Sequence, residues 1–257
     1  MLTLDKLNED IFFQRLSSRI SMSPNDDAFI YIHGYNVPFA EAIRRTAQIA
    51  FDLNFQGAPI FYSWPSAGKF SKYIPDEASI EWTIPHLVKF ASELTSRSVA
   101  NILHLIAHSM GNRALARALE QASRGNKRGS TVKLNQIFLA APDIDAGVFR
   151  QLSSDIIASG ERTTLYASSN DLPLAMSQQF HAYPRAGEGG SNIIAIPGMD
   201  TIDASNVPSG FFGHSYYAGT RTVLSDMYEL VKHGEPPPRF GLKEINKGME
   251  RYWVLQP

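Results

Sequence analysis

Short apolar runs that alternate with helical patterns are the feature that most limits how this chain can fold. Each run is rich in Ile, Phe, Leu and Tyr, is too short for a helix, and ends at Gly, Pro, Ser or Asp. Runs of this kind are typical of buried parallel strands. The predicted strands are AFIYIHGY from Ala28, APIFYSWP from Ala58, NILHLIAHS from Asn101, QIFLAAPDID from Gln136, TTLYASSND from Thr163 and NIIAIPGMD from Asn192.

Helical stripes lie between most of these runs. The first begins near Pro38 and stops at Gly57, and the second begins at Pro85. Three more stripes cover Ala114–Ala122, Val148–Ile157 and Val223–Val231. Alternating strands and helices favour right-handed crossovers, so we predict an α/β fold with a mainly parallel sheet of about six strands and helices on both faces.

The chain shows no internal repeat and no linker, so we expect residues 1–257 to form a single domain with its core at about 28–232. Two segments, 62–82 and 171–190, lack a clear period and are expected to be irregular caps or rims over the site. The tail from His233 is expected to be an extended surface strap.

Composition narrows the class of function. With 24 basic and 25 acidic residues, the chain has no net field to attract nucleic acid. It contains no cysteine, which excludes disulfides, thiol nucleophiles and Cys-ligated metals. No run approaches the roughly 20 apolar residues of a membrane span. The N-terminal stretch has acids where an export signal is basic, so we expect a cytoplasmic location.

Ser109 ends the third predicted strand, where a parallel sheet collects its ligands. Residues 107–111, AHSMG, match the small-x-Ser-x-Gly form of a nucleophile elbow, in which a strained strand-to-helix turn pushes the hydroxyl outward. The alternative is a serine that only caps the following helix. The strand, the small flanking residues and the helix agree with each other and favour a nucleophile.

A second motif, His33 to Asn36, ends the first predicted strand. A His-Gly pair at this place lets the chain bend so that the next amide points into the site, and we assign the backbone amides of Tyr35 and Met110 to an oxyanion hole. The alternative is a plain glycine turn with Asn36 as a helix cap. We expect His33 to brace the loop rather than to catalyse.

Together, FIYIHGYN, FYSWPS, LIAHSMGNR, LAAPDID, YASSND and GHSYY resemble a bacterial α/β-hydrolase family of esterase- and lipase-like proteins catalogued without an assigned function. The resemblance covers most of the chain, from about Ala28 to about Val231. The chain departs from the pattern in having Ala107 where the commonest elbow has Gly. The N-terminal part is also too short for the antiparallel strands that open a full α/β-hydrolase sheet.

The order expected for this fold is serine, then acid, then histidine. Of the three histidines after Ser109, His181 lies in an irregular segment and His233 ends the last helix. His214 follows the last predicted strand and is our candidate general base. The alternative is an ordinary surface-loop histidine.

Two acids could orient this base. Asp171 follows the fifth predicted strand and Asp143 follows the fourth. The family resemblance and the usual strand position favour Asp171. We expect Asp143 to cap a helix or to support the site through a hydrogen bond.

We therefore predict a carboxylic-ester hydrolase that works through an acyl-enzyme, without a cofactor or metal, on a small-molecule ester with an apolar acyl chain. His33, Trp64, Phe211 and Phe212 are candidate lining of the substrate pocket. The same triad could cleave thioesters or amides, and the oligomeric state stays open.

Two functions from other classes compete with this prediction. One is a non-catalytic binding module on the same fold, since fold does not imply function. The other is a metal hydrolase using His33, Asp143, Asp171 and His214, which lacks any ligand-spaced cluster.

Overall fold

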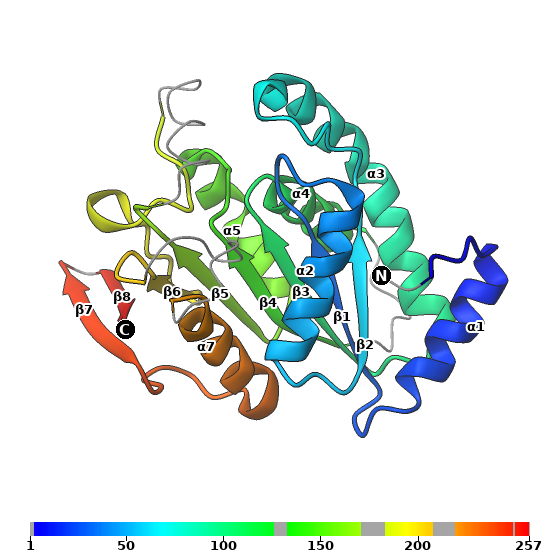
Figure 1. The fold of residues 1–257 in the computed structure, drawn as a ribbon. Coiled ribbons are helices and arrows are strands. Elements are labelled where there is room, and N and C mark those ends of the chain that lie inside the picture. The colour runs from blue at the N-terminus through cyan, green and yellow to red at the C-terminus, as the bar shows by residue number, and fades with distance from the viewer. Residues whose placement is uncertain (1–2, 126–132, 171–182, 208–218, 249, 257) are drawn as a thin grey trace.

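The computed structural model describes residues 3–125, 133–170, 183–207, 219–248 and 250–256. Within these ranges one eight-stranded sheet has the order β2-β1-β3-β4-β5-β6-β8-β7 (Figure 1). Every neighbouring pair is parallel except β7 and β8. The strands are β1 Asp27–Ile32, β2 Ala58–Tyr62, β3 Ile102–His108, β4 Lys133–Ala140, β5 Arg162–Ala167, β6 Asp200–Asp203, β7 Leu242–Lys247 and β8 Glu250–Leu255.

Helices cover both faces of the sheet (Figure 1). Helices α1, α3, α4 and α5 pack on one face, and α2 and α7 pack on the other. Their bounds are α1 Glu9–Ile20, α2 Phe39–Asp52, α3 Tyr73–Arg97, α4 Gly111–Arg124, α5 Ala146–Ser159 and α7 Gly219–His233, with short 3-10 turns η1 at Phe70–Lys72 and η2 at Gly190–Asn192. The predicted α/β architecture is confirmed.

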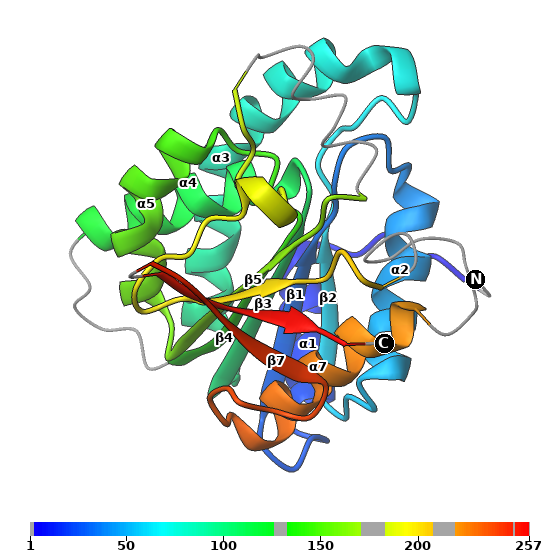
Figure 2. The same cartoon turned by 90° about the vertical axis from the view of Figure 1, so that its left-hand side faces the viewer.

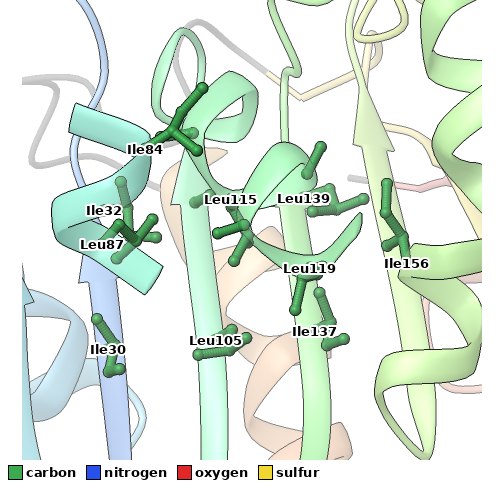
Figure 3. Close-up of a cluster of buried hydrophobic side chains, with 14 of the residues drawn as sticks. Ile30, Ile32, Ile84, Leu87, Leu105, Leu115, Leu119, Ile137, Leu139 and Ile156 are labelled. Carbon is green, nitrogen blue, oxygen red and sulfur yellow. The ribbon is translucent and has the colours of Figure 1, made fainter. Parts of the chain in front are cut away.

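Successive side chains of the buried strands point to opposite faces of the sheet, so a strand such as β1 contributes to both hydrophobic clusters. In β1, Ile30 and Ile32 face α3 and α4, whereas Phe29 and Tyr31 point to the opposite cluster. Burying each such side chain contributes about 1.5–3 kcal/mol. Figure 3 shows the first cluster, in which the strand residues meet the helices through Ile30, Ile32, Ile84, Leu87, Leu105, Leu115, Leu119, Ile137, Leu139 and Ile156.

The C-terminal part of the chain corrects two predictions. The sixth strand is β6 at Asp200–Asp203, not the run that starts at Asn192. The tail is no strap, because β7 and β8 form a hairpin whose second strand pairs with β6 (Figure 2). Burial of Trp253 and Leu255 on alternate positions of β8 holds this hairpin on the core.

The N-terminal part also adds to the core beyond the expected 28–232. Helix α1, which we did not predict, buries Phe13, Leu16 and Ile20. The side chain of Asn8 caps it by accepting a hydrogen bond from the Ile11 amide at 2.9 Å. In the described residues before β1 there is this helix and no strand, in agreement with the expected lack of N-terminal antiparallel strands.

Two helix boundaries differ from prediction. Helix α3 begins at Tyr73 and contains Pro85, so the second half of the segment 62–82 is helical rather than irregular. Helix α2 ends at Asp52, before Gly57. A Cβ atom at Gly57 would lie 2.2 Å from the Asp27 carbonyl oxygen, so this glycine permits close passage beside β1 rather than capping a helix.

No helix in the described ranges is both long enough and apolar enough to cross a bilayer.

A buried histidine of β3, His104, makes the stability of this fold depend on pH. His104 is 2% exposed, packs edge-on against the Phe55 ring, and its Nδ1 has no hydrogen-bond partner among the described residues. Burial outweighs the attraction of the Asp27 carboxylate and lowers the pKa of His104 from 6.5 to about 4. The unfolded chain therefore binds this proton more readily than the folded one.

We predict that the free energy of unfolding falls as pH drops from 6.5 towards 4, by on the order of 3 kcal/mol through His104. Urea unfolding across this range should give a flatter curve for His104→Gln than for the wild type. The exposed His86→Gln should follow the wild-type curve. Equal slopes for His104→Gln and the wild type would contradict the assignment.

Candidate active site

Ser109 occupies a strained turn between β3 and α4. Its φ is +50°, a left-handed conformation that costs a non-glycine residue about 1–2 kcal/mol. Hydrogen bonds fix the turn from both sides: the Ser109 amide donates to the Ala140 carbonyl at 2.9 Å, and the amides of Asn112 and Asp143 donate to the Ser109 carbonyl at 3.1 and 3.2 Å. The predicted strand, sharp turn and helix are all present.

Two glycines allow the surrounding backbone to approach this turn. A Cβ atom at Gly111 would lie 2.5 Å from the His33 carbonyl oxygen and 2.7 Å from that of Ile32. A Cβ atom at Gly34 would lie 2.9 Å from the Ser109 Cβ. The loop that follows β1 therefore lies directly against the serine.

This contact brings the loop that carries Tyr35, one of the two residues that we assigned to an oxyanion hole, beside Ser109. Tyr35 follows Gly34 in the loop beside Ser109, and Met110 precedes the first residue of α4. Among the described residues, no acceptor pairs with the Met110 amide. The positive end of the α4 dipole points to the same place, which favours a developing anion. The oxyanion hole itself stays a prediction.

His33 and Trp64 brace each other behind this loop. Their rings stack with centroids 5.1 Å apart, and the Trp64 indole donates to the His33 carbonyl at 2.7 Å. The His33 Nδ1 lies 3.0 Å from the Gly34 carbonyl oxygen, and its Nε2 lies 3.3 Å from the Ser63 hydroxyl. Burial lowers the pKa of His33, so the imidazole is neutral at neutral pH. These contacts fit a bracing role, while a pocket-lining role for either residue stays a prediction.

Asp143 lies beneath the elbow in a buried ionic network. Its carboxylate accepts from the Tyr73 hydroxyl at 2.6 Å and pairs with Arg113 and Arg185 at 3.3 Å each. Arg113 also donates to the Asp143 carbonyl at 2.6 Å and pairs with Glu77 at 2.5 Å. This carboxylate is 2% exposed and is already engaged by two guanidinium groups and a phenol.

Sequence reasoning missed the partners in this network. Tyr73 and Glu77 lie in a segment expected to be irregular, and Arg185 lies in the second such segment. Arg113 stands four residues after Ser109 in the motif LIAHSMGNR, which is the one local signal that could have marked it.

Asp171, His214, Phe211 and Phe212 lie outside the described residues. The strands that precede them are described: β5 ends at Ala167, and β6 ends at Asp203. Both strands run parallel to β3, so their carboxyl ends lie at the same edge of the sheet as Ser109. The chain therefore leaves the sheet on the side of the serine before each of these residues.

No group of three His, Cys, Asp or Glu residues within the described ranges could hold a metal ion. Two of the four ligands considered for a metal hydrolase, Asp171 and His214, fall outside those ranges.

A family model described as "Alpha/beta hydrolase of unknown function (DUF900)" matches residues 8–231. The family resemblance inferred from the sequence motifs is thereby confirmed. A search of curated proteins returns no match.

Solved structures with a similar fold include a hydrolase from Thermoplasma acidophilum described as CIB-like, with 14% identity, coverage of 81% of this chain and 87% of that chain, and a TM-score of 0.42. Carboxyl esterase 2 from the fungus Tuber melanosporum has 12% identity, coverage of 82% and 79%, and a TM-score of 0.45. Phospholipase PlaB from Legionella pneumophila has 12% identity, coverage of 90% and 67%, and a TM-score of 0.45. Because these TM-scores lie below 0.5, the likenesses carry no conclusion about activity.

We predict that Gly111→Ala destabilises the fold by about 1–3 kcal/mol or more, because the new Cβ meets two backbone carbonyls that cannot move aside. Gly125→Ala, at the exposed end of α4, is the matched control and should be nearly neutral, because its new Cβ would meet nothing closer than 3.5 Å. Urea unfolding of both variants measures the difference. Equal midpoints would show that β1 and α4 are not in close contact at this point.

Proposed function

The chain belongs to a family of α/β hydrolases of unknown function, and from this membership and the geometry of Ser109 we propose that it is a serine hydrolase that cleaves carboxylic esters. The reaction proceeds through an acyl-enzyme intermediate. The substrate is a small-molecule ester with an apolar acyl chain, and Phe211 and Phe212 contribute to its pocket.

The first half of the reaction forms the acyl-enzyme. The Ser109 hydroxyl attacks the ester carbonyl while His214 takes its proton, and Asp171 holds the imidazole in the required tautomer. The amides of Tyr35 and Met110 donate hydrogen bonds to the oxyanion of the tetrahedral intermediate. His214 then returns the proton to the departing alcohol.

The second half repeats these roles with water as the nucleophile. His214 takes a proton from water, which attacks the acyl carbon and forms a second tetrahedral intermediate. Collapse of this intermediate breaks the bond to the serine oxygen, and the imidazolium returns the proton to Ser109. The products are a carboxylic acid and an alcohol.

The observation that carries the proposal is the strained backbone at Ser109. The alternative, a serine that only caps α4, finds no support: Met110 is the N-cap residue, and no amide of the first turn of α4 donates to the Ser109 hydroxyl among the described residues. A serine that caps a helix with its side chain typically has an extended backbone, whereas Ser109 has a φ of +50°. Strained conformations of this kind persist where function requires them.

We predict that Ser109→Ala keeps its fold but lowers turnover of a nitrophenyl ester by up to ~10⁶-fold. The wild type should also react rapidly with a fluorophosphonate probe, and the variant should not. Ser92→Ala, on the exposed side of α3, is the control and should behave as the wild type in both assays. A folded Ser109→Ala with near-full activity would exclude this serine as the nucleophile.

We predict different defects for the two acids. Asp171→Asn should cut turnover by about 10⁴-fold with little loss of stability, because an amide favours the wrong imidazole tautomer. Asp143→Asn should lower the free energy of unfolding by about 3 kcal/mol, because it takes the negative charge away from the buried Arg185 guanidinium and leaves Arg113 with Glu77 alone of its two carboxylates. Its folded fraction should retain most of the turnover.

Urea unfolding and kcat with one activated ester at neutral pH separate these defects. The reverse pattern, a crippled but stable Asp143→Asn and a nearly normal Asp171→Asn, would move the acid to the loop after β4.

A further inference from the structure

The carboxyl ends of β5 and β6 are joined by hydrogen bonds that centre on Ser205. Strand pairing continues past Asp203, because the Ala204 amide donates to the Ala167 carbonyl at 2.8 Å. The Ser169 amide then donates to the Ser205 hydroxyl at 2.8 Å, and the Asn170 side chain donates to the Ser205 carbonyl at 2.7 Å. The loop after β5 is thereby attached to the loop after β6.

Asp203 anchors this attachment. One carboxylate oxygen accepts from both the hydroxyl and the amide of Ser205, and the other accepts from the Gly190 amide at 2.9 Å. Because the Ser205 hydroxyl donates to a carboxylate, it is polarised and becomes a better acceptor for the Ser169 amide. Asp203 is 6% exposed, so water competes little for these bonds.

A third segment packs into the same point. A Cβ atom at Gly189 would lie 2.4 Å from the Ser205 hydroxyl oxygen and 2.9 Å from the Ser169 nitrogen. The Ser168 amide donates to the Gly187 carbonyl at 2.9 Å. Three separate segments, 168–170, 187–190 and 203–205, therefore meet around one carboxylate.

The position of this cluster in the chain suggests its role. Asn170 is bonded directly to Asp171, and Val207, at the end of the described part of the second loop, stands seven residues before His214. A change in the distance between the two loops would therefore displace the starting points of the segments that carry Asp171 and His214. Neither Asp203 nor Ser205 is needed to hold the strands themselves, which pair through backbone bonds up to Ala204.

We propose that Asp203 and Ser205 are positioning residues that set the distance between the acid-bearing loop and the histidine-bearing loop. This inference rests on the proposed function, since it assigns Asp171 and His214 as the groups being positioned. Asp203 and Ser205 touch neither the substrate nor the reacting atoms and act through Asp171.

The test is a double-mutant cycle between Asp203→Asn and Asp171→Asn in the full chain. Asp203→Asn should lower kcat about 10- to 100-fold with little change in KM, since small misplacements of catalytic groups have effects of this size. The double variant should be no slower than Asp171→Asn alone, because an acid that is already lost cannot be mispositioned. Losses that multiply instead would overturn the proposal.

Ser205→Ala offers a second route if Asp203→Asn folds poorly. It removes only the hydroxyl that links Ser169 to Asp203, so its kcat should fall in the same way. Ser191→Ala, an exposed serine in the neighbouring η2 turn, is the matched control and should keep the wild-type kcat. Equal kcat for Ser205→Ala and Ser191→Ala would overturn the proposal.

Two further readouts separate positioning from general weakening. The acid limb of the pH profile of kcat/KM should move to lower pH in Asp203→Asn, as in Asp171→Asn, because a less well placed carboxylate stabilises the imidazolium less. Hydrogen exchange at the Ser169 amide should accelerate in Ser205→Ala but not in Ser191→Ala. An unmoved pH limb or an unchanged exchange rate would count against the proposal.

Failure of the proposed function has a different signature. Ser109→Ala would then keep the wild-type rate, and the positioning role would fail with it. If Ser109→Ala is inactive but the losses in the cycle multiply, the hydrolase proposal survives and only the positioning role is overturned.

Discussion

Close contact between the end of β1 and the start of α4 is the constraint on which the site depends. A side chain at Gly111 would overlap the carbonyls of Ile32 and His33, and one at Gly34 would overlap Ser109. With so little space, the chain after β3 can enter α4 only through a sharp turn, which takes Ser109 to φ +50°. The same contact brings the loop after Gly34 close to the serine, so a single packing requirement produces both the strained turn at Ser109 and the approach of the loop that carries Tyr35.

The strain in this turn is offset by a polar network drawn from distant parts of the chain. The Asp143 amide donates a hydrogen bond to the Ser109 carbonyl. The Asp143 carboxylate accepts a hydrogen bond from the Tyr73 hydroxyl and forms an ion pair with Arg185. Charge-assisted bonds of this kind are worth roughly 1.5–3 kcal/mol each, which exceeds the cost of one positive φ. Tyr73 begins α3, and Arg185 lies between β5 and β6. The network therefore also links these two segments to the turn at Ser109.

The predictable part of this structure is the part with short-range signals. Strands β1 to β5 each contain a short run of apolar residues, and the turn at Ser109 is marked by its immediate neighbours, so the strands and the turn could be identified from the sequence. We predicted that the helix before β3 begins at Pro85, because proline normally occupies the first turn of a helix. Helix α3 instead begins at Tyr73, and Pro85 is tolerated inside it on an exposed face. Strand β8 was missed because only Trp253 and Leu255 are deeply buried in a charged segment. The partners of Asp143 are 30 to 70 residues away and leave no local pattern.

The network also bears on which strand supplies the acid. For Asp143 to orient an imidazole, its carboxylate would have to weaken its pairing with Arg113 or with the buried Arg185, and breaking a buried ion pair costs several kcal/mol. One imidazole hydrogen bond returns only about 1.5–3 kcal/mol, even when it involves a charge. The exchange is unfavourable, which favours our proposal that the acid comes from another strand end. In the sheet order the next strand is β5, whose loop is attached through Ser205 to the loop that leads to His214. The ion pairs of Asp143 and the hydrogen bonds at Ser205 therefore both favour Asp171 as the acid, because Asp171 follows the loop that is attached to the histidine-bearing loop.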